Sequence, residues 1–199
     1  MDKTKLNKHF ILASSSKRRL ELLNQIGVKP DLILSPNINE EIFSKELPRI
    51  YVKRMSLEKN IVFQPKYPES IILTADTVVC VGRRILPKTI DRNTAEECLK
   101  LISGRRHKVF TSFTLYSPNN SLKTKTIQSI IKFKRLHADE ISYYLASNEW
   151  EGKAGGYAIQ GIAASFINFI SGSYSNIVGL PLAELYRLLI SIGYNFKNG

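Results

Sequence analysis

The feature that most constrains the fold of this 199-residue chain is an almost unbroken apolar and β-branched run, Ile71–Val81. Apolar residues at successive rather than alternate positions are typical of a strand that is buried on both faces. Polar residues interrupt the run at its middle, and one of them, Asp76, is a carboxylate. A buried carboxylate is costly unless it pairs with a cation, binds a metal or acts as a base. We therefore predict a central strand, in which Asp76 is either salt-bridged or, as we favour, functional, because ligands bind at strand ends in α/β sheets.

Shorter apolar segments and helical patterns alternate along the rest of the chain. Strands are predicted at residues 9–13, 31–34, 84–86, 109–116 and 124–135, and helices at 17–26, 47–62, 94–102, 139–145 and 182–192. Thr94 is predicted to cap its helix and Pro181 to occupy a first helical position. Crossover and hairpin connections together predict an α/β fold with a mixed, twisted β-sheet flanked by helices. We expect a single domain over residues 1–199, in which residues 137–193 form a candidate second lobe.

The composition excludes several classes of protein. Hydrophobic residues make up 43% of the chain, which is typical of globular rather than disordered proteins. No apolar run approaches the about 20 residues of a membrane span, and the run Phe10–Ala13 is too short for a secretory signal. Cys80 and Cys98 are too few for a disulfide scaffold, and we expect both to pack in the core. The sequence thus predicts a cytoplasmic protein with no membrane partner.

The balance of charge is strongly positive, with 29 Lys and Arg residues against 17 Asp and Glu residues. Such a balance indicates either a polyanionic partner or a lysine-rich solvated surface. Lys3, Lys5 and Lys8 contribute to one basic cluster near the start of the chain, and residues 123–135 form a second. In the second cluster, cations alternate with apolar residues, which is typical of the solvated face of a strand. We therefore expect residues 123–135 to form a solvated sheet face rather than a nucleic-acid groove.

Ser14–Ser16 lie between the first predicted strand and the cations Lys17–Arg19, which begin a predicted helix. Free N–H groups at a helix N-terminus bind phosphate, whereas cations in the first turn oppose the helix dipole. Three successive cations therefore need either a bound anion or full solvation. These residues alone leave both interpretations open: a phosphate site, or a serine N-cap followed by solvated cations.

Other charged and glycine-rich segments are less specific when taken singly. Glu40, Lys59 and Lys88 would each be ordinary surface charges. Residues 152–161 and 171–181 are rich in glycine, which indicates tight turns or close approach of the backbone to another group. Their spacing matches neither the phosphate-binding P-loop nor the dinucleotide fingerprint. The three histidines lack metal-ligand spacing.

Motifs spread over residues 10–190 resemble, in order, those of the Maf family of nucleoside triphosphate pyrophosphatases. The segments that carry the resemblance are Leu12–Arg19, Ile38–Glu40, Glu58–Lys59, Ala75–Val79, Lys88, Ser103–Thr111, Lys153–Gly161 and Gly172–Pro181. The sequence departs from the family pattern at Lys17, Thr89, Trp150 and Gly152. Together the motifs cover nearly the whole chain.

The resemblance implies two lobes around a nucleotide-binding cleft and hydrolysis of a nucleoside triphosphate to a monophosphate and diphosphate. Asp76 corresponds to the proton acceptor of the family. Asp76 and Glu40 would also hold a divalent cation, Mg²⁺ or Mn²⁺, because these ions prefer oxygen ligands. The implied catalytic residues are Asp76, Glu40, Lys88 and Lys59, and the implied substrate-binding residues are Ser14, Ser16, Arg18, Arg19, Thr77 and Gln160. Homodimers are common in the family, so a homodimer is also expected.

Gln160 indicates the base. The family branch associated with dTTP and UTP carries Gln at this position, and an amide offers both the donor and the acceptor that match O4 and N3–H of uracil or thymine. The expected partner is therefore a single nucleotide, including modified pyrimidine nucleotides removed from the cellular pool, and not a nucleic-acid strand. The alternative is a basic nucleic-acid-binding or cell-division regulatory protein without catalysis. Against it, the sequence contains no helix-turn-helix, RRM or OB pattern.

Overall fold

A computed structural model describes residues 9–119 and 121–196 and shows seven strands in one sheet, in the order β2-β1-β3-β5-β6-β7, with β4 paired to β3. The strands are β1 (Phe10–Ala13), β2 (Leu32–Leu34), β3 (Ile71–Val81), β4 (Arg84–Leu86), β5 (Arg106–Ser117), β6 (Ser121–Phe133) and β7 (Ile167–Ser171). Strands β1, β2 and β3 run parallel, and the other pairings are antiparallel. The predicted mixed sheet with a central strand is confirmed.

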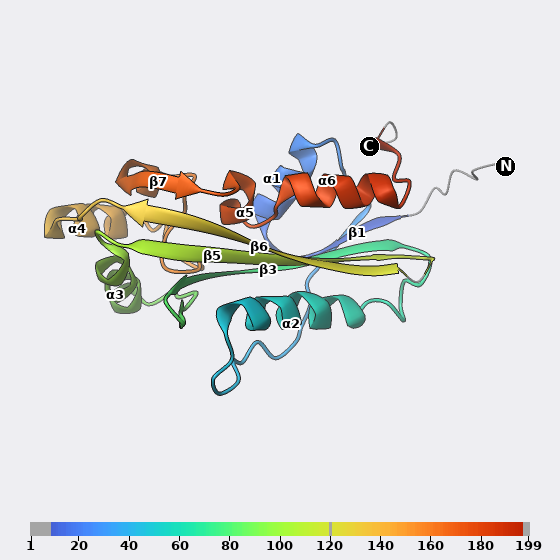
Figure 1. Cartoon of the computed structure of the whole chain (residues 1–199), viewed down its shortest axis with the longest axis horizontal. Coiled ribbons are helices and arrows are strands. Elements are labelled where there is room, and N and C mark those ends of the chain that lie inside the picture. Colours follow the sequence, from blue (N-terminus) through green and yellow to red (C-terminus); the bar gives the residue numbers. More distant parts are fainter. Residues whose placement is uncertain (1–8, 120, 197–199) are drawn as a thin grey trace.

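Helices cover both faces of this sheet (Figure 1). They are α1 (Lys17–Gln25), α2 (Pro48–Ile61), α3 (Arg92–Ile102), α4 (Ala138–Ala146), the 3₁₀ turn η1 (Ile162–Phe166), α5 (Tyr174–Val178) and α6 (Leu182–Ser191). Helix α2 lies on one face, and α1 and α6 lie on the other. The flanked α/β architecture follows from this arrangement.

Side chains of β3 alternate between these two faces, as the two-residue period of a strand requires. Ala75 and Val79 belong to the main core, which also contains residues of α1, α3 and α6. Val78 and Cys80 face the other way and pack against α2. Both cysteines are buried and free, as expected, with Cys98 in the main core. Asp76 shares the α2 face, and Thr77 shares the main-core face.

The edge of β3 that faces β1 is paired only at its two ends. β1 pairs with residues 71–73, and β4 pairs with residues 79–81. The opposite edge is paired with β5 along residues 72–80. Among the described strands, none pairs with residues 74–78 on the β1 side, which leaves a notch in the sheet. The notch brings side chains from both faces of β3 next to the same opening.

Two predicted helix starts are corrected by the structure. Helix α3 begins at Arg92 with Asp91 as its N-cap, and the Asp91 carboxylate accepts bonds from both the N–H and the hydroxyl of Thr94. Thr94 is therefore not the cap, because the stronger acceptor precedes it. Pro181 is the N-cap of α6 rather than its first helical residue.

Strand β7 and helix α5 were not predicted from the sequence. β7 is an edge strand whose residues are mostly exposed, so its apolar pattern is weak. It joins residues of the candidate second lobe to the same sheet, and the division into lobes stays a prediction. Of the predicted basic cluster near the start of the chain, Lys3, Lys5 and Lys8 lie outside the described residues.

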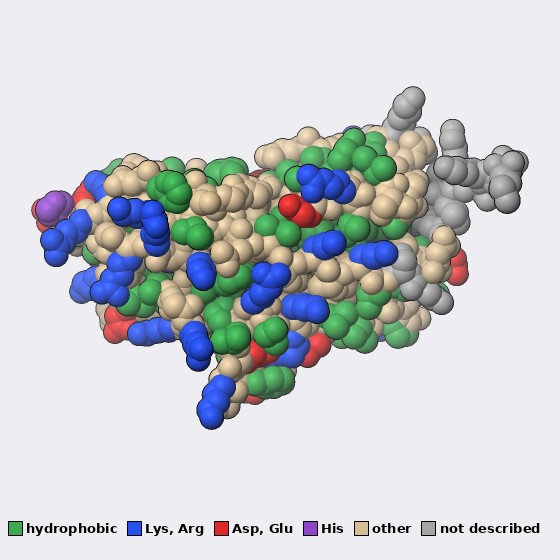
Figure 2. Space-filling view, in the orientation of Figure 1, with side chains coloured by type: hydrophobic (Ala, Val, Ile, Leu, Met, Phe, Trp, Pro, Cys, Tyr) green, Lys and Arg blue, Asp and Glu red, His purple; other side chains and the backbone are tan. Residues whose placement is uncertain are grey.

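The second basic cluster lies where the sequence predicted. Lys123, Lys125 and Lys132 are exposed on β6, which confirms that these cations are solvated. They do not share one face, because the alternation of the strand places Lys123 and Lys125 opposite to Lys132. Figure 2 shows Lys and Arg side chains spread along the visible face, with few acids among them. Within the described residues, no helix is long and apolar enough to span a bilayer.

Candidate functional site

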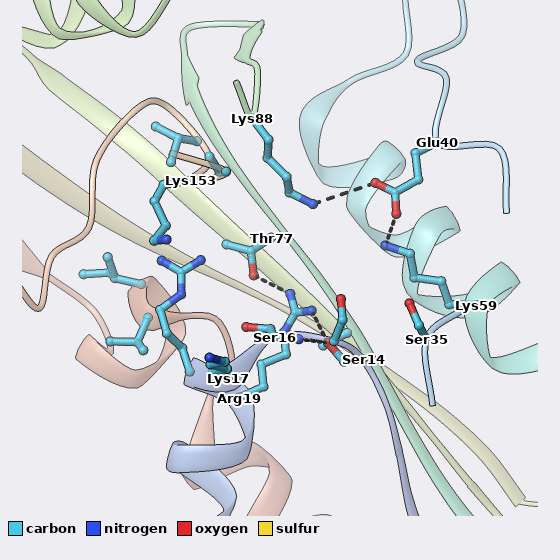
Figure 3. A pocket seen from close by; sticks show the side chains of 18 of the residues that line it. Ser14, Ser16, Lys17, Arg19, Ser35, Glu40, Lys59, Thr77, Lys88 and Lys153 are labelled. Atoms are coloured by element: carbon cyan, nitrogen blue, oxygen red, sulfur yellow. Dashed lines mark hydrogen bonds and ion pairs between the residues drawn. The ribbon is translucent and has the colours of Figure 1, made fainter. Parts of the chain in front are cut away.

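A cavity of about 450 Å³ opens at the notch in β3. The segment Ser14–Arg19, which follows the carboxyl end of β1, lines one side of it, and Val79 and Lys88 lie along the other. Figure 3 shows side chains of the lining residues converging on this opening from several elements. The location agrees with the general rule that α/β sheets bind ligands beyond the carboxyl ends of parallel strands.

Two lysines and two carboxylates form an ionic network at the α2 side of the cavity. The Nζ atom of Lys59 lies 2.6 Å from Oε1 of Glu40 and 2.9 Å from Oδ1 of Asp76. The Nζ atom of Lys88 lies 3.7 Å from Oε2 of Glu40 and 3.5 Å from the same Asp76 oxygen. Asp76 is only 1% exposed. Because each carboxylate contacts both lysines, the four charges balance and a buried carboxylate becomes tolerable.

Each member of this network has a local reason for its position. Lys59 falls on the buried stripe of α2 with Val52 and Met55, and it lies in the last turn, where a cation favours the helix dipole. The hydroxyl of Tyr51 donates to the backbone oxygen of Glu40 at 2.9 Å and so links the preceding loop to α2. Lys88 forms an isolated β-bridge with Ala154, so the glycine-rich segment 152–161 holds its backbone in place.

The carboxylates suit a divalent cation. Oδ2 of Asp76 is buried and has no hydrogen-bond partner among the residues that the structure describes, whereas Oδ1 contacts both lysines. No group of three His, Cys, Asp or Glu side chains with metal-binding geometry occurs in the described part of the chain. Mg²⁺ commonly takes one or two carboxylates and completes its shell with water and substrate phosphates. Asp76 and Glu40 fit that kind of site.

Arg19 occupies the main-core side of the notch and is buried. Its guanidinium donates to the backbone oxygen of Gly179 at 2.9 Å, to Oγ of Ser14 at 2.9 Å and to Oγ1 of Thr77 at 3.1 Å. Thr77 shares a further bond of 2.9 Å with Thr111. Burial lowers the pKa of Arg19, and the negative charge of Asp76 opposes that shift. Arg19 therefore links β1, β3 and the end of α5 through neutral oxygen atoms.

The three successive cations at the start of α1 thus have different surroundings. Lys17 is exposed, Arg18 is partly buried and Arg19 is buried. Ser16 is the N-cap residue, but its side chain makes no capping bond. Arg19 lines the cavity and is held by protein oxygens, so full solvation does not describe it. A phosphate site at these residues stays a prediction.

On the main-core side, apolar side chains line the cavity. Tyr157, Ile159, Ile177 and Val178 belong both to this lining and to the main core. The hydroxyl of Tyr157 lies 2.8 Å from Nε2 of the buried residue His107. Burial lowers the pKa of His107 to about 4, so this histidine is neutral at physiological pH. An apolar end beside an ionic end can hold a flat ring and a polyanion together.

Comparison with known proteins agrees with this geometry. The family model described as Maf-like protein matches residues 9–192. The chain belongs to the Maf family. A nucleoside triphosphate pyrophosphatase of Ehrlichia ruminantium (strain Welgevonden) is 52% identical over 181 residues, which cover 91% of this chain and 94% of the relative. A dTTP/UTP pyrophosphatase of Wolbachia pipientis wMel is 50% identical over 190 residues, covering 95% and 96%.

The fold also resembles that of a solved structure with low sequence identity. The structure of a HAM1 protein from Coxiella burnetii matches with a TM-score of 0.50 at 13% identity, covering 92% of this chain and 99% of that chain. At this identity the similarity supports the fold alone. It agrees with the α/β class predicted from the sequence.

The structure brings most of the residues implied by the Maf motifs to one cavity. Those that line it are Ser14, Ser16, Arg18, Arg19, Glu40, Lys59, Thr77 and Lys88. Asp76 contacts Lys59 and Lys88 from beneath this lining. Gln160 is exposed and lies outside the lining, although its neighbour Ile159 belongs to it. The role of Gln160 in base choice stays a prediction.

Other lining residues were not identified from the sequence as part of a site. They include Ser35, Glu151, Lys153, Tyr157, Ile159, Ile177 and Val178. The glycine-rich segment was a signal for Lys153, because tight turns there indicated close approach to another group. The apolar residues carry no such signal, since a side chain that lines a cavity and one in the core look alike in a sequence.

Proposed function

We propose that this Maf protein hydrolyses nucleoside triphosphates between the α- and β-phosphates, giving a nucleoside monophosphate and diphosphate. The observation that carries the proposal is the buried Asp76 carboxylate, which lies against Lys59 and Lys88 beneath the lining of the cavity and has one oxygen without a hydrogen-bond partner among the described residues. The names of relatives about half identical in sequence support the same activity. The ionic end would receive the phosphates, and the apolar end would receive the nucleoside.

The reaction is a displacement at the α-phosphorus. The oxygen of a water molecule forms a bond to this phosphorus, and the bond from phosphorus to the oxygen bridging toward the β-phosphate breaks. Diphosphate leaves with that oxygen and its electron pair. Oδ2 of Asp76 would accept the proton of the water, since Oδ1 is held by the two lysines. Proton acceptance by a positioned carboxylate and preorganised cations are the expected sources of rate enhancement.

The lysines have a second task in this scheme. Lys59 and Lys88 lie beside the carboxylates and would offset negative charge that develops on the phosphates. Glu40, whose side chain is 42% exposed, would be the more accessible ligand for Mg²⁺ or Mn²⁺, with Asp76 beside it. When bound, such a cation supplies charge neutralisation at the phosphate oxygens.

We further propose a preference for dTTP and UTP, and a role in removing modified pyrimidine nucleotides in the cytoplasm. The relative from Wolbachia carries the name dTTP/UTP pyrophosphatase. Gln160 supports the same preference through the amide argument given above. A Gln160→Glu variant should lower turnover of UTP relative to 7-methyl-GTP, and an unchanged ratio would remove Gln160 from the account. The predicted homodimer stays a prediction.

The decisive experiment measures diphosphate release from a panel of ribo- and deoxyribonucleoside triphosphates with Mg²⁺. Asp76→Asn keeps the shape of the side chain but removes the basic oxygen, so kcat should fall by about 10²- to 10⁴-fold. Asp139→Asn is the matched control, because Asp139 is exposed in the first turn of α4. No diphosphate from any nucleotide, or full activity of Asp76→Asn, would defeat the proposal. Nucleic-acid binding without turnover would favour the alternative of a non-catalytic regulator.

A further inference from the structure

The end of the cavity opposite the ionic network contains a cation that the reaction above does not use. Figure 3 shows Lys153 extending into the cavity on the side away from Glu40 and Lys59. Its side chain is carried by the turn after Trp150 and not by a regular helix or strand.

The backbone of this turn is closely constrained. Lys153 N–H donates to the oxygen of Trp150, and Lys153 oxygen accepts from the N–H of Gly156, both at 3.1 Å. Gly155 has a φ of 70°, and a Cβ atom there would lie 2.8 Å from the side chain of Val79. The turn is therefore pressed against the end of β3. Lys153 is presented to the cavity from a fixed backbone position.

Lys153 forms no ion pair within the described residues, although Glu151 lines the same cavity and its charge and that of Glu149 favour the protonated ammonium. The Nζ atom of Lys153 donates to the backbone oxygen of Glu151 at 3.1 Å. Arg18 lines the same cavity and likewise forms no ion pair among the described side chains. Burial lowers the pKa of Lys153 first, and the positive charge of Arg18 lowers it further. Two neighbouring cations facing one cavity are stabilised by a ligand that supplies acceptor atoms.

The surroundings distinguish a base from a phosphate as that ligand. Tyr157, Ile159 and Ile177 line the same cavity and belong to the main core, against which Ala154, the neighbour of Lys153, also packs. Apolar side chains suit the faces of a ring and do not solvate a phosphate. The phosphates already have a place at the opposite end, beside Lys59 and Lys88.

We propose that Lys153, together with Arg18, recognises the nucleobase by donating hydrogen bonds to its carbonyl oxygens. Lys and Arg side chains only donate, so they favour a carbonyl group and oppose an amino group at the same position. Uracil, thymine and guanine present a carbonyl oxygen where cytosine and adenine present an amino group. The chain would thus discriminate between bases chiefly by this substituent. This inference rests on the proposed function and specifies its substrate class.

The test compares UTP with CTP, which share the C2 carbonyl and differ in the C4 substituent and in whether N3 carries a proton. Wild type should have the higher kcat/KM for UTP. Lys153→Met should lower the ratio of UTP to CTP by about tenfold, because one charge-assisted bond is lost. Lys153→Arg keeps a donor and should retain the preference. Lys123→Met, which changes an exposed lysine on β6, is the matched control and should leave the ratio unchanged.

Several outcomes would overturn the inference. An equal fall in kcat/KM for UTP and CTP in Lys153→Met would show that Lys153 binds phosphate. An unchanged ratio, or a wild type without preference between the two, would also overturn it. If Lys153→Met does not fold, Lys153→Gln provides the same comparison, because an amide donates to a carbonyl and accepts from an amino group and so should flatten the ratio.

A binding experiment separates this inference from the proposed function. If wild type cleaves neither nucleotide, the hydrolysis proposal fails, but calorimetric titration with UMP and CMP still tests base recognition. Tighter binding of UMP than CMP by wild type, lost in Lys153→Met, would support the role of Lys153. Equal binding of the two by wild type would overturn it.

Discussion

Asp76 and Thr77 are neighbours on β3, yet they face opposite sides of the sheet and have opposite kinds of partner. On the α2 side, the Asp76 carboxylate forms ion pairs with Lys59 and Lys88. On the main-core side, Thr77 bonds to Arg19, whose other bonds run to the neutral oxygens of Ser14 and Gly179. The α2 face thus carries a cluster of ionisable groups. The other face uses a cation as a structural link.

The difference shows that a buried cation is understood from its partners and not from its charge. A lysine ammonium is a compact charge on a flexible stem, which suits a position between Glu40 and Asp76. A guanidinium is a planar fork that can hold several acceptors at fixed angles. Lys59 therefore bridges the two carboxylates of the proposed reacting site, and Arg19 links the elements around the cavity.

The largest expected effect comes from Lys59→Met. The substitution leaves Asp76 buried with only Lys88, whose Nζ is 3.5 Å away. The free energy of unfolding should fall by about 3–5 kcal/mol, since removing one partner leaves a buried charge uncompensated. Diphosphate release should fall by about 100-fold or more. Urea denaturation and steady-state kinetics measure the two effects. Lys66→Met, at an exposed position, should change stability by less than about 0.5 kcal/mol.

Arg19→Met should have the next largest effect on stability. It leaves the acceptors on Ser14, Thr77 and Gly179 without their donor, so the free energy of unfolding should fall by about 2–3 kcal/mol. Arg19→Lys sharpens the comparison, because it keeps the charge and loses the fork. Full stability in Arg19→Lys would mean that charge, rather than geometry, is what this side of the sheet requires.

Lowering the pH should reduce the free energy of unfolding through His107, which lies on the main-core side. Its pKa is lowered to about 4 in the folded protein, against about 6.5 in the unfolded chain. The unfolded state therefore binds the proton more readily, so stability from this group is full above pH 6.5 and falls as pH decreases toward 4. Between pH 7.5 and pH 5.0 the loss should be about 2 kcal/mol. Urea titrations at both pH values, with His107→Gln beside wild type, measure it; equal slopes in the two proteins would contradict the assignment.

Thr77→Val should have the smallest effect. It is close to isosteric and removes the bonds to Arg19 and Thr111, so a loss of about 1 kcal/mol is expected. When Thr77→Val is combined with Arg19→Met, the double variant should lose less free energy of unfolding than the two single variants together, because both substitutions remove the same bond. Simple additivity in the double variant would show that the Thr77–Arg19 bond contributes little.

The central strand and its carboxylate were predictable because burial on both faces leaves a strong pattern. The run Ile71–Val81 admits few alternatives, and a carboxylate within it is conspicuous. Lys59 was also accessible to such an argument, since it shares the buried stripe of α2 with Val52 and Met55. The contact between Lys59 and Glu40 was not predictable in this way, because Glu40 lies on an irregular loop and no local sequence pattern places it beside α2. That expectation depended on the resemblance to the Maf family.

Weaker elements escaped prediction for physical reasons. β7 lies at an edge and is exposed, so it lacks the apolar pattern that marks inner strands. Asp91 and Thr94 are both good capping residues, and side-chain geometry rather than residue type decides between them. For Gln160 the family motif was recognisable, but a motif gives a residue's position in the chain and not its distance from the cavity.

The notch in β3 has a consequence for the thermodynamics of association. Its ends are set by β1 and β4, which are held by their own pairing with β3, and its opposite edge is held by β5 along the whole gap. Five residues of strand span about 16 Å, so the register of the sheet fixes the length of the opening. A ligand that enters this part of the site does not have to order the backbone first. Little conformational entropy should then be lost on binding here, and affinity should be governed by the groups that the ligand meets.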